Sequence, residues 1–187
     1  MRTPSGDPQD DDAARFRACY ERVYDDLLRF VQRRAHRSHA EDVVAEVFLL
    51  AWRRLPDLPR DLDSARAWLF GIAHKTLANT RRSADRREAL SVRIAEHATL
   101  QDPAADPDLV AARLDLATAW RRLPAVHQEA LALTAWERLS SPQAAAVLGI
   151  SPTAYRLRLS RARRALRIHL QHPQVAPLRP VTEVSRP

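Results

Sequence analysis

The hydrophobic positions of the first half of the chain recur three or four residues apart, and this spacing predicts three amphipathic helices. The second helix is predicted to start with the capping-box pattern Ser38–Glu41 and to stop before Pro56. Ser64 is the predicted cap of the third helix. Three such helices with short connections are typical of a small bundle. Their predicted buried stripes are Phe16, Tyr20, Val23, Tyr24, Leu27, Leu28 and Val31; Val43, Val44, Val47, Phe48 and Ala51; and Trp68, Leu69, Ile72, Ala73 and Leu77.

The second half of the chain predicts four further helices. One starts near Leu109 and ends before Pro124, and the next covers roughly 126–138. Two Ser-Pro pairs then follow ten residues apart, at 141–142 and 151–152. Serine is a good helix cap and proline suits the first helical position, so each pair predicts a helix start. Because Gly149 lies between them, the pattern predicts a helix-turn-helix.

Composition supports an all-α fold and a soluble, cytoplasmic protein. The 187 residues are 45% hydrophobic and contain only 3 glycines, which favours helices over hairpins. The single cysteine, Cys19, cannot form an internal disulfide, which fits a reducing compartment. The longest apolar run is far shorter than the roughly 20 residues of a membrane span. The net charge of +7 suggests an acidic partner such as nucleic acid.

The charge is not distributed evenly, and it divides the chain. Residues 13–87 and 109–170 are basic, whereas residues 88–108 hold five acids, one arginine and two prolines. We therefore expect two small helical domains joined by a flexible acidic linker that is long enough to let them sit on separate surfaces. Residues 1–12 are predicted to be a disordered acidic N-terminus, and residues 171–187 a disordered, proline-rich tail.

The last predicted helix has one apolar face and a strongly basic remainder. Tyr155, Leu159 and Ala162 are predicted to pack inward, and residues 151–170 contain six arginines and no acid. Arginine can donate two hydrogen bonds to guanine in the major groove, or it can bind a phosphate. The alternative is a solvated basic helix in an arginine-rich protein.

Two helices of the first half carry candidate surfaces of a different kind. Trp68 and Phe70 lie on a basic helix that suits unstacked single-stranded bases, although both could instead be core residues. On the second helix, Asp42, Glu46 and Leu49 lie opposite the buried stripe. They form either a protein docking surface or an ordinary solvated face.

Catalytic chemistry has no support in the sequence. The seven histidines are scattered, and no HExxH, Cys/His metal spacing, glycine-rich phosphate loop or G-x-S-x-G is present. We therefore expect no enzyme activity, no catalytic residue, no metal and no cofactor. This also argues against a nucleic-acid-processing enzyme.

Two stretches of the chain resemble a known family. The runs AEDVVAEVFLLAWRRL and ARAWLFGIAHKTLANTRRS resemble region 2 of bacterial sigma factors. The run LPAVHQEALALTAWERLSSPQAAAVLGISPTAYRLRLSRARRAL resembles their region 4. With only a short linker between them, the chain is similar to extracytoplasmic-function (ECF) sigma factors of the sigma-70 family, over about residues 13–170.

The resemblance implies a function in transcription initiation and assigns residues to it. Region 2 would bind the clamp helices of the largest RNA polymerase subunit and recognise and melt the −10 promoter element. Region 4 would read the −35 element and sit at the polymerase flap, and an anti-sigma factor is a further expected partner. The core-polymerase positions are Glu41, Asp42, Glu46, Leu49 and Arg53. The −10 positions are Arg60, Asp61, Asp63, Ser64, Trp68, His74, Lys75, Asn79, Arg81 and Arg82. The −35 positions are Thr153, Arg156, Leu157, Arg158, Ser160, Arg161, Arg163 and Arg167.

The sequence departs from the family pattern at three places. Arg138 stands where relatives often have glycine, Tyr155 replaces a small buried aliphatic residue, and Lys75 stands where many relatives have asparagine. The rival interpretation, a stand-alone helix-turn-helix regulator, leaves the first block of the chain without a role.

Overall fold

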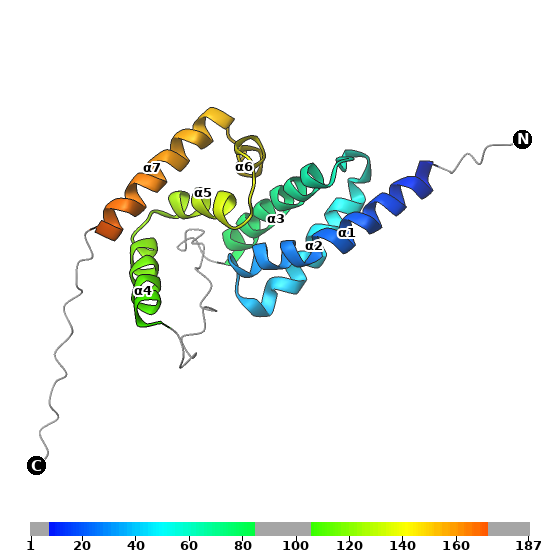
Figure 1. Ribbon diagram of the computed structural model, residues 1–187. Coiled ribbons are helices and arrows are strands. Elements are labelled where there is room, and N and C mark those ends of the chain that lie inside the picture. The colour runs from blue at the N-terminus through cyan, green and yellow to red at the C-terminus, as the bar shows by residue number, and fades with distance from the viewer. Residues whose placement is uncertain (1–7, 85–105, 172–187) are drawn as a thin grey trace, which may run out of the picture.

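All regular elements in the described parts of the chain are helical, as the sequence predicts (Figure 1). The computed structural model describes residues 8–84 and 106–171. The first half consists of α1 (Pro8–Gln32), α2 (Ala40–Arg53) and α3 (Leu62–Ala84), with 3-10 turns at Arg37–His39 and Leu55–Asp57. The second half consists of α4 (Pro107–Arg121), α5 (Ala125–Ala135), α6 (Ser141–Leu148) and α7 (Pro152–Gln171).

Helix ends differ from three of the expected domain limits, because α1 includes residues 8–12, α4 includes residues 107–108 and α7 includes Gln171. Because α1 begins at Pro8, residues 8–12 are helical rather than part of a disordered terminus. Asp106 accepts a hydrogen bond from the Asp108 backbone N–H at 3.0 Å and caps α4, so the last residues of the expected linker belong to this helix. The rest of the linker and all but the first residue of the expected tail lie outside the described residues.

The first half is a three-helix bundle packed around the predicted stripes. Val23, Leu27 and Val47 are almost fully buried. The rings of Phe30 and Phe70 stack with their centroids 4.6 Å apart. Burying an aromatic side chain of this size stabilises a fold by about 1.5–3 kcal/mol. Phe70 is therefore a core residue, and it is unavailable for nucleic acid.

Two helices of this bundle start differently from the prediction. Ser38 is not the cap of α2, because its backbone N–H donates to His36 Nδ1 within the preceding 3-10 turn. The cap of α3 is Asp61 rather than Ser64: its carboxylate accepts the Ser64 backbone N–H at 2.8 Å. Hydrogen bonds from the Ser64 backbone and hydroxyl also lower the pKa of Asp61. An anionic cap suits the positive end of a helix dipole better than a hydroxyl does.

The second half contains the predicted helix-turn-helix, formed by α6 and α7. Gly149 ends α6 with φ of 65°, a left-handed conformation that glycine adopts without strain. Ser151 caps α7 through the Ala154 backbone N–H at 3.1 Å, as predicted. The start of α6 differs by one residue, because Ser140 rather than Ser141 forms the capping box, with Gln143.

The turn between α5 and α6 explains one departure from the family pattern. The predicted helix over 126–138 ends at Ala135, and Arg138 has φ of 53°. A residue with a Cβ in this region costs about 1–2 kcal/mol relative to the right-handed conformation, and glycine avoids that cost. The frequent glycine of the relatives fits this backbone, whereas Arg138 adopts it under strain.

Tyr155, the second departure, is held by polar contacts inside the second half. Its side chain is fully buried. Its hydroxyl donates to the Ala130 carbonyl oxygen at 2.8 Å and lies 2.7 Å from the Thr134 hydroxyl. Burial raises the pKa of this phenol. These bonds tie the first turn of α7 to α5, so the orientation of α7 depends on this tyrosine.

We expect Tyr155→Phe to destabilise the second half by about 0.5–1.5 kcal/mol, because the variant loses the hydrogen bond from the buried hydroxyl to the Ala130 carbonyl oxygen. The urea midpoint of unfolding would measure this loss. Thr134→Val should cost less, because the tyrosine could still donate to Ala130. Equal stability of Tyr155→Phe and the parent protein would contradict the importance of this bond.

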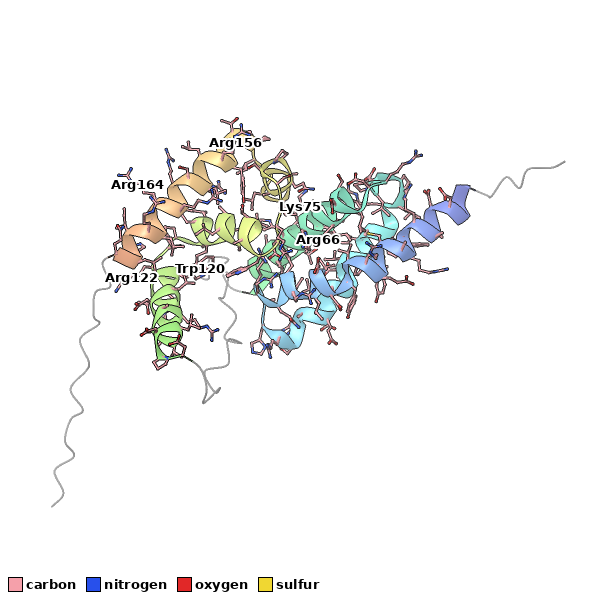
Figure 2. All side chains as sticks on the ribbon, in the orientation of Figure 1. Arg66, Lys75, Trp120, Arg122, Arg156 and Arg164 are labelled. Carbon is pink, nitrogen blue, oxygen red and sulfur yellow. The ribbon has the colours of Figure 1, made fainter. Side chains whose placement is uncertain are left out.

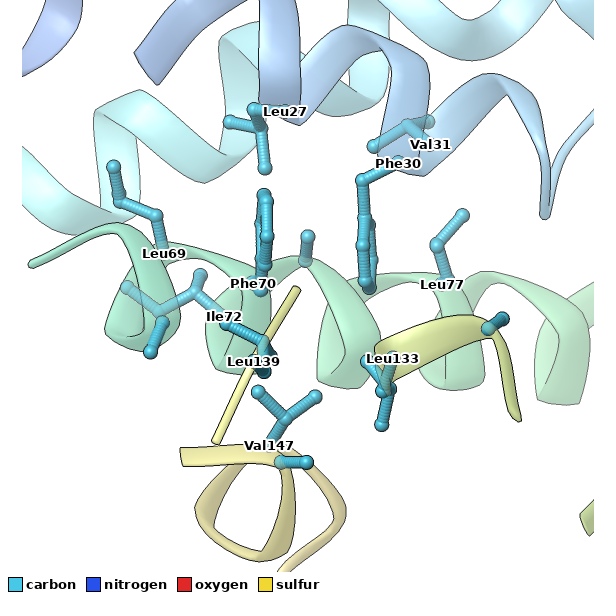
Figure 3. Close-up of a cluster of buried hydrophobic side chains, with 14 of the residues drawn as sticks. Leu27, Phe30, Val31, Leu69, Phe70, Ile72, Leu77, Leu133, Leu139 and Val147 are labelled. Atoms are coloured by element: carbon cyan, nitrogen blue, oxygen red, sulfur yellow. The ribbon is translucent and has the colours of Figure 1, made fainter. Parts of the chain in front are cut away.

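The two halves are packed against each other rather than placed on separate surfaces. Helix α6 lies on α3, and the buried side chains of both halves form one continuous core. Figure 3 shows Leu139 and Val147 of the second half beside Ile72 of α3. A Cβ placed on Gly71 would lie 3.9 Å from the Val147 Cα atom. None of the helices in the described ranges is both long and apolar enough to span a membrane.

Candidate protein and nucleic-acid interfaces

The exposed face of α2 carries the residues predicted to bind protein. The buried residues of α2, which include Val43 and Val47, face α1 and α3, and the opposite side is in solvent. Asp42 and Glu46 lie one turn apart on that side, and Leu49 is 51% exposed although it is apolar. All five residues predicted to bind core polymerase are exposed on α2: Glu41, Asp42, Glu46, Leu49 and Arg53.

Two aromatic residues beside this face were missed as candidates. Tyr20 was assigned to the buried stripe of α1, but it is 41% exposed, and Trp52 on α2 is 48% exposed. Trp52 packs on the partly buried Phe16, with ring centroids 5.0 Å apart, and Tyr20 packs on the buried Phe48, with centroids 4.5 Å apart. Exposed Trp and Tyr often dominate the binding energy of protein interfaces. The sequence signal was the position of Trp52, one turn beyond Leu49.

The loop before α3 forms one wall of a small cavity. The cavity has a volume of about 190 Å³, and α1 forms the facing wall. Three arginines surround it, from α1 and from the loop, while its inner surface is apolar. Cys19 is buried there, and burial raises the pKa of its thiol. The lining residues are Arg15, Ala18, Cys19, Arg22, Pro59, Arg60, Leu62 and Ala65.

The predicted −10 residues before and at the start of α3 do not share one surface in the structure. Arg60 lines the cavity, whereas Asp61 points its carboxylate back to cap α3. Asp63 lines a second, more polar cleft of about 350 Å³ between the halves, together with Asp26, Arg66, Arg138, Leu139 and Gln143.

Three of the α3 candidates share one face of the helix, and a fourth does not. Trp68, Lys75 and Asn79 lie at i, i+7 and i+11; Lys75 and Asn79 are exposed, and Trp68 is half-buried. The Arg54 guanidinium carbon lies 5.7 Å from the Trp68 ring centroid. Around the helix axis, His74 lies about a third of a turn from Lys75 and faces the second half of the protein. Burial there lowers the pKa of His74. The side chains of Arg81 and Arg82 lie outside the described residues.

The surface of α7 has the predicted division into an apolar and a basic side. Tyr155, Leu159 and Ala162 are buried, and Arg158 is partly buried. Figure 2 shows Arg156 and Arg164 on the side of α7 that faces away from α5. The exposed candidates on this helix are Thr153, Arg156, Leu157, Ser160, Arg161, Arg163 and Arg167.

The electrostatics of α7 favour an anionic partner over an internal one. The ion pairs resolved in the described residues involve none of its arginines. The resolved polar contact of Arg156 is to the Thr153 hydroxyl one turn earlier, at 3.2 Å. Guanidinium groups that lack carboxylate partners can bind phosphates and guanine edges. A helix-turn-helix with such a basic second helix, on the same chain as a three-helix bundle, is typical of a DNA-binding protein of transcription.

Comparison with known proteins narrows this class to one family. The family model of sigma-70 region 2 matches residues 19–87, and that of sigma-70 region 4 matches residues 113–166. The ECF RNA polymerase sigma factor SigL of Mycobacterium tuberculosis is 34% identical over 164 residues, covering 86% of this chain and 91% of SigL. RNA polymerase sigma factor CnrH of Cupriavidus metallidurans is 35% identical over 139 residues, covering 69% of this chain and 72% of CnrH.

Two solved structures have the same arrangement of helices. The sigma factor RpoE, in complex with the anti-sigma factor NepR from Bartonella quintana, is 25% identical with a TM-score of 0.59, covering 83% of this chain and 96% of RpoE. CnrH in complex with the cytosolic domain of CnrY is 29% identical with a TM-score of 0.55, covering 83% of this chain and 87% of CnrH. The chain belongs to the sigma-70 family, in its extracytoplasmic-function branch. Its function is promoter-specific initiation of transcription with RNA polymerase, a regulatory rather than an enzymatic function.

Proposed function

We propose that three separate surfaces of this chain carry out the steps of initiation, one for each partner. The exposed face of α2 binds the clamp helices of the largest polymerase subunit. The cavity beside Arg60 and the face of α3 bind the −10 element, and α7 binds the −35 element. One observation supports this assignment above all: two exposed faces of opposite charge lie on different helices. The face of α2 is acidic and apolar, which suits a protein partner, and the face of α7 is basic, which suits DNA.

The proposed −10 surface suits a base that has left the duplex. Unpaired bases bind in pockets with an apolar or aromatic wall, and their phosphates need cations nearby. The cavity beside Arg60 provides an apolar interior, and its lining includes the cationic side chains of Arg22 and of Arg15, which also pairs with Asp12. Lys75 and Asn79 on α3 would follow the strand beyond it.

The proposed −35 surface suits an intact duplex. The N-terminal part of a recognition helix contacts base edges in the major groove, and the residues further along reach the backbone. Arg156 and Ser160 lie in the first half of α7, whereas Arg163 and Arg167 lie in the second half. This division assigns base reading to the former pair and phosphate binding to the latter.

The cellular setting and further partners follow from the same assignment. We place the protein in the cytoplasm, where the polymerase core and promoter DNA are, and we expect the second half to contact the polymerase flap. An anti-sigma factor is a further expected partner, because RpoE and CnrH are each in complex with a second protein, NepR and CnrY.

Run-off transcription tests the proposal. The purified protein is combined with core polymerase and a library of genomic promoter fragments, and the transcripts are sequenced. We expect transcripts from a subset of fragments that share sequence at −35 and −10, and none when the protein or the core is omitted. A protein that binds DNA specifically but neither copurifies with the core nor yields transcripts would instead be a stand-alone regulator.

A further inference from the structure

An exposed leucine lies within the basic surface of α7. Leu157 is 52% exposed. Among the large apolar side chains exposed on α7, which the structure describes from Pro152 to Gln171, Leu157 alone lies in the first half of the helix. Single exposed leucines are common on protein surfaces, so the position of this one determines what it can bind.

Helical geometry places Leu157 at the centre of the outward side of α7. Tyr155 and Leu159, two residues before and after it, are both buried. At about 100° a residue, Leu157 lies about 160° around the helix from each of them. Arg164 follows seven residues later, about 20° away, and Figure 2 shows it on the side that faces away from α5. When this side of α7 enters the major groove, Leu157 faces the base edges rather than the phosphates at the groove walls.

The surroundings of Leu157 favour DNA over a protein as its partner. The exposed side chains within one turn of it include Thr153, Ser160 and Arg161, and residues 151–170 contain six arginines and no acid. Protein interfaces bury several apolar side chains together at their centre and contain few charges there. A single leucine among arginines and hydroxyl groups suits an anionic partner that presents one small apolar group.

A leucine contacts the major groove in a different way from its polar neighbours. The Leu157 side chain has no hydrogen-bond donor or acceptor, so it can bind neither a polar base edge nor a phosphate. Any polar atom that it covers in the groove would lose its hydrogen bonds to water, which is unfavourable. Of the groups that bases present in the major groove, the C5-methyl group of thymine is the apolar one. Leu157 therefore favours thymine, because the contact removes two apolar groups from water together.

The neighbouring arginine indicates where in the element this thymine lies. Arg156, which we assign to base reading, directly precedes Leu157, and its guanidinium donates to the Thr153 hydroxyl at 3.2 Å. Consecutive Cα atoms are about 3.8 Å apart, which is close to the roughly 3.4 Å between successive base pairs. The two side chains therefore reach the same base pair or adjacent ones. The thymine is expected at or next to the base pair that Arg156 reads.

We propose that Leu157 selects a thymine in the −35 element by packing against its C5-methyl group. This inference rests on the proposed function of α7, and it adds an apolar determinant of sequence to the arginine contacts. One buried methyl group is worth about three- to fivefold in affinity. The preference should not change with salt, because thymine and its methyl-free analogue deoxyuridine leave the same phosphates bound.

Replacement of thymine by deoxyuridine tests the proposal, because it removes the methyl group and leaves base pairing intact. The full-length protein is bound to core polymerase and to promoter fragments recovered by run-off transcription. Each thymine of the −35 element, on either strand, is replaced singly, and affinity is measured by competition. The base pair that Arg156 reads is located by the preference that Arg156→Ala relaxes. We expect one replacement at or next to it to weaken binding about three- to fivefold, at low and at physiological salt alike.

Two alanine variants assign the effect to this leucine. Leu157→Ala removes most of the side chain at an exposed position, so the helicity measured by circular dichroism should not change. It should bind the thymine and deoxyuridine fragments equally, with about the affinity of the parent for deoxyuridine. Ile168→Ala is the matched control: Ile168 is 47% exposed and about 20° from Leu157 around the helix, but it lies about 16 Å further along α7. This control should keep the parent's preference for thymine.

The other outcomes each decide against a part of the argument. The proposal is overturned if the element has no thymine near that base pair, or if no replacement there weakens binding of the parent. It is also overturned if Leu157→Ala keeps the full preference for thymine, or if Ile168→Ala loses it too. A loss of affinity for core polymerase in Leu157→Ala, with the thymine preference intact, would make the leucine a protein contact. If no fragments with a shared −35 sequence are recovered with the parent protein, the proposed function of α7 itself fails, and the leucine contact fails with it.

Discussion

Core polymerase should bind roughly tenfold to a hundredfold more weakly when Asp42 and Glu46 are both changed to Arg, because like charges facing each other across an interface cost several kcal/mol. Both carboxylates are exposed on α2, one turn apart and opposite the buried residues of that helix. Neither contributes to the core, so the fold should persist. Affinity can be measured by fluorescence anisotropy of a labelled protein titrated with core polymerase, and helicity by circular dichroism.

The chain offers a matched control for this reversal. Glu21 and Asp25 form a second exposed acidic pair with the same spacing, on α1 of the same half. Changing them to Arg alters the net charge equally and should leave polymerase affinity within about twofold, because neither lies on α2 and exposed charges outside a contact are screened at physiological salt. Asp42 lies in the first turn of α2, so its reversal also costs about 0.3–1 kcal/mol through the helix dipole. Equal loss of affinity in both double variants would show that net charge, rather than this face, matters.

Helix-level features could be predicted because they depend on neighbours in the sequence. The buried stripes of α2 and α3, the left-handed Gly149 and the Ser151 cap all follow from residues within one or two helical turns of each other. Two of the three wrong caps arose where Ser38 and Ser64 each had a competing polar group nearby. His36 binds the Ser38 N–H, and the more suitable Asp61 begins α3.

The junction between the halves could not be predicted in the same way. Arg34 and its carboxylate partners are separated by 95 and 103 positions, and no periodicity connects them. In the sequence, Glu129 and Glu137 are merely two acids in a basic block. The same limit applies to His74: its place on α3 could be predicted, but its direction depends on where the second half packs.

Among the three candidate surfaces, too, those formed by one helix could be predicted and the one formed by distant segments could not. The exposed residues of α2 and α7 follow from the helical period once the buried stripe is known, so their faces could be predicted. The cavity beside Arg60 could not, because Arg15 and Arg22 reach it from α1, about 40 positions earlier in the chain. Tyr20 belongs to the predicted buried stripe but is 41% exposed, because helical spacing alone does not say how much of a ring stays in solvent while it packs on a neighbour, as this ring does on Phe48.

The arginines of α7 should divide into two classes when each is changed to Ala. Ser151 and the buried Tyr155 fix the first turn of α7, so the N-terminal half of the helix would point into the major groove. Arg156 and Arg161 lie in or at the edge of that half, and Arg163 and Arg167 lie beyond it. An Arg that binds guanine with two hydrogen bonds provides about 1–3 kcal/mol of discrimination against other bases. An Arg bound to phosphate provides affinity for any sequence, and its loss lowers the salt dependence by about one unit of slope.

We therefore expect Arg156→Ala or Arg161→Ala to relax the preference for one −35 sequence by about tenfold to a hundredfold. Arg163→Ala or Arg167→Ala should weaken binding to all sequences alike and flatten the salt dependence. Affinities for a panel of single-base −35 variants at several salt concentrations separate the two effects, and Arg113→Ala on α4 controls for the lost charge. If Arg163→Ala changed base preference while Arg156→Ala altered only the salt slope, α7 would lie in the groove in a different orientation. The contacts of Tyr155 with α5 would then have to differ in the DNA-bound protein, because they set the direction in which each of these arginines points.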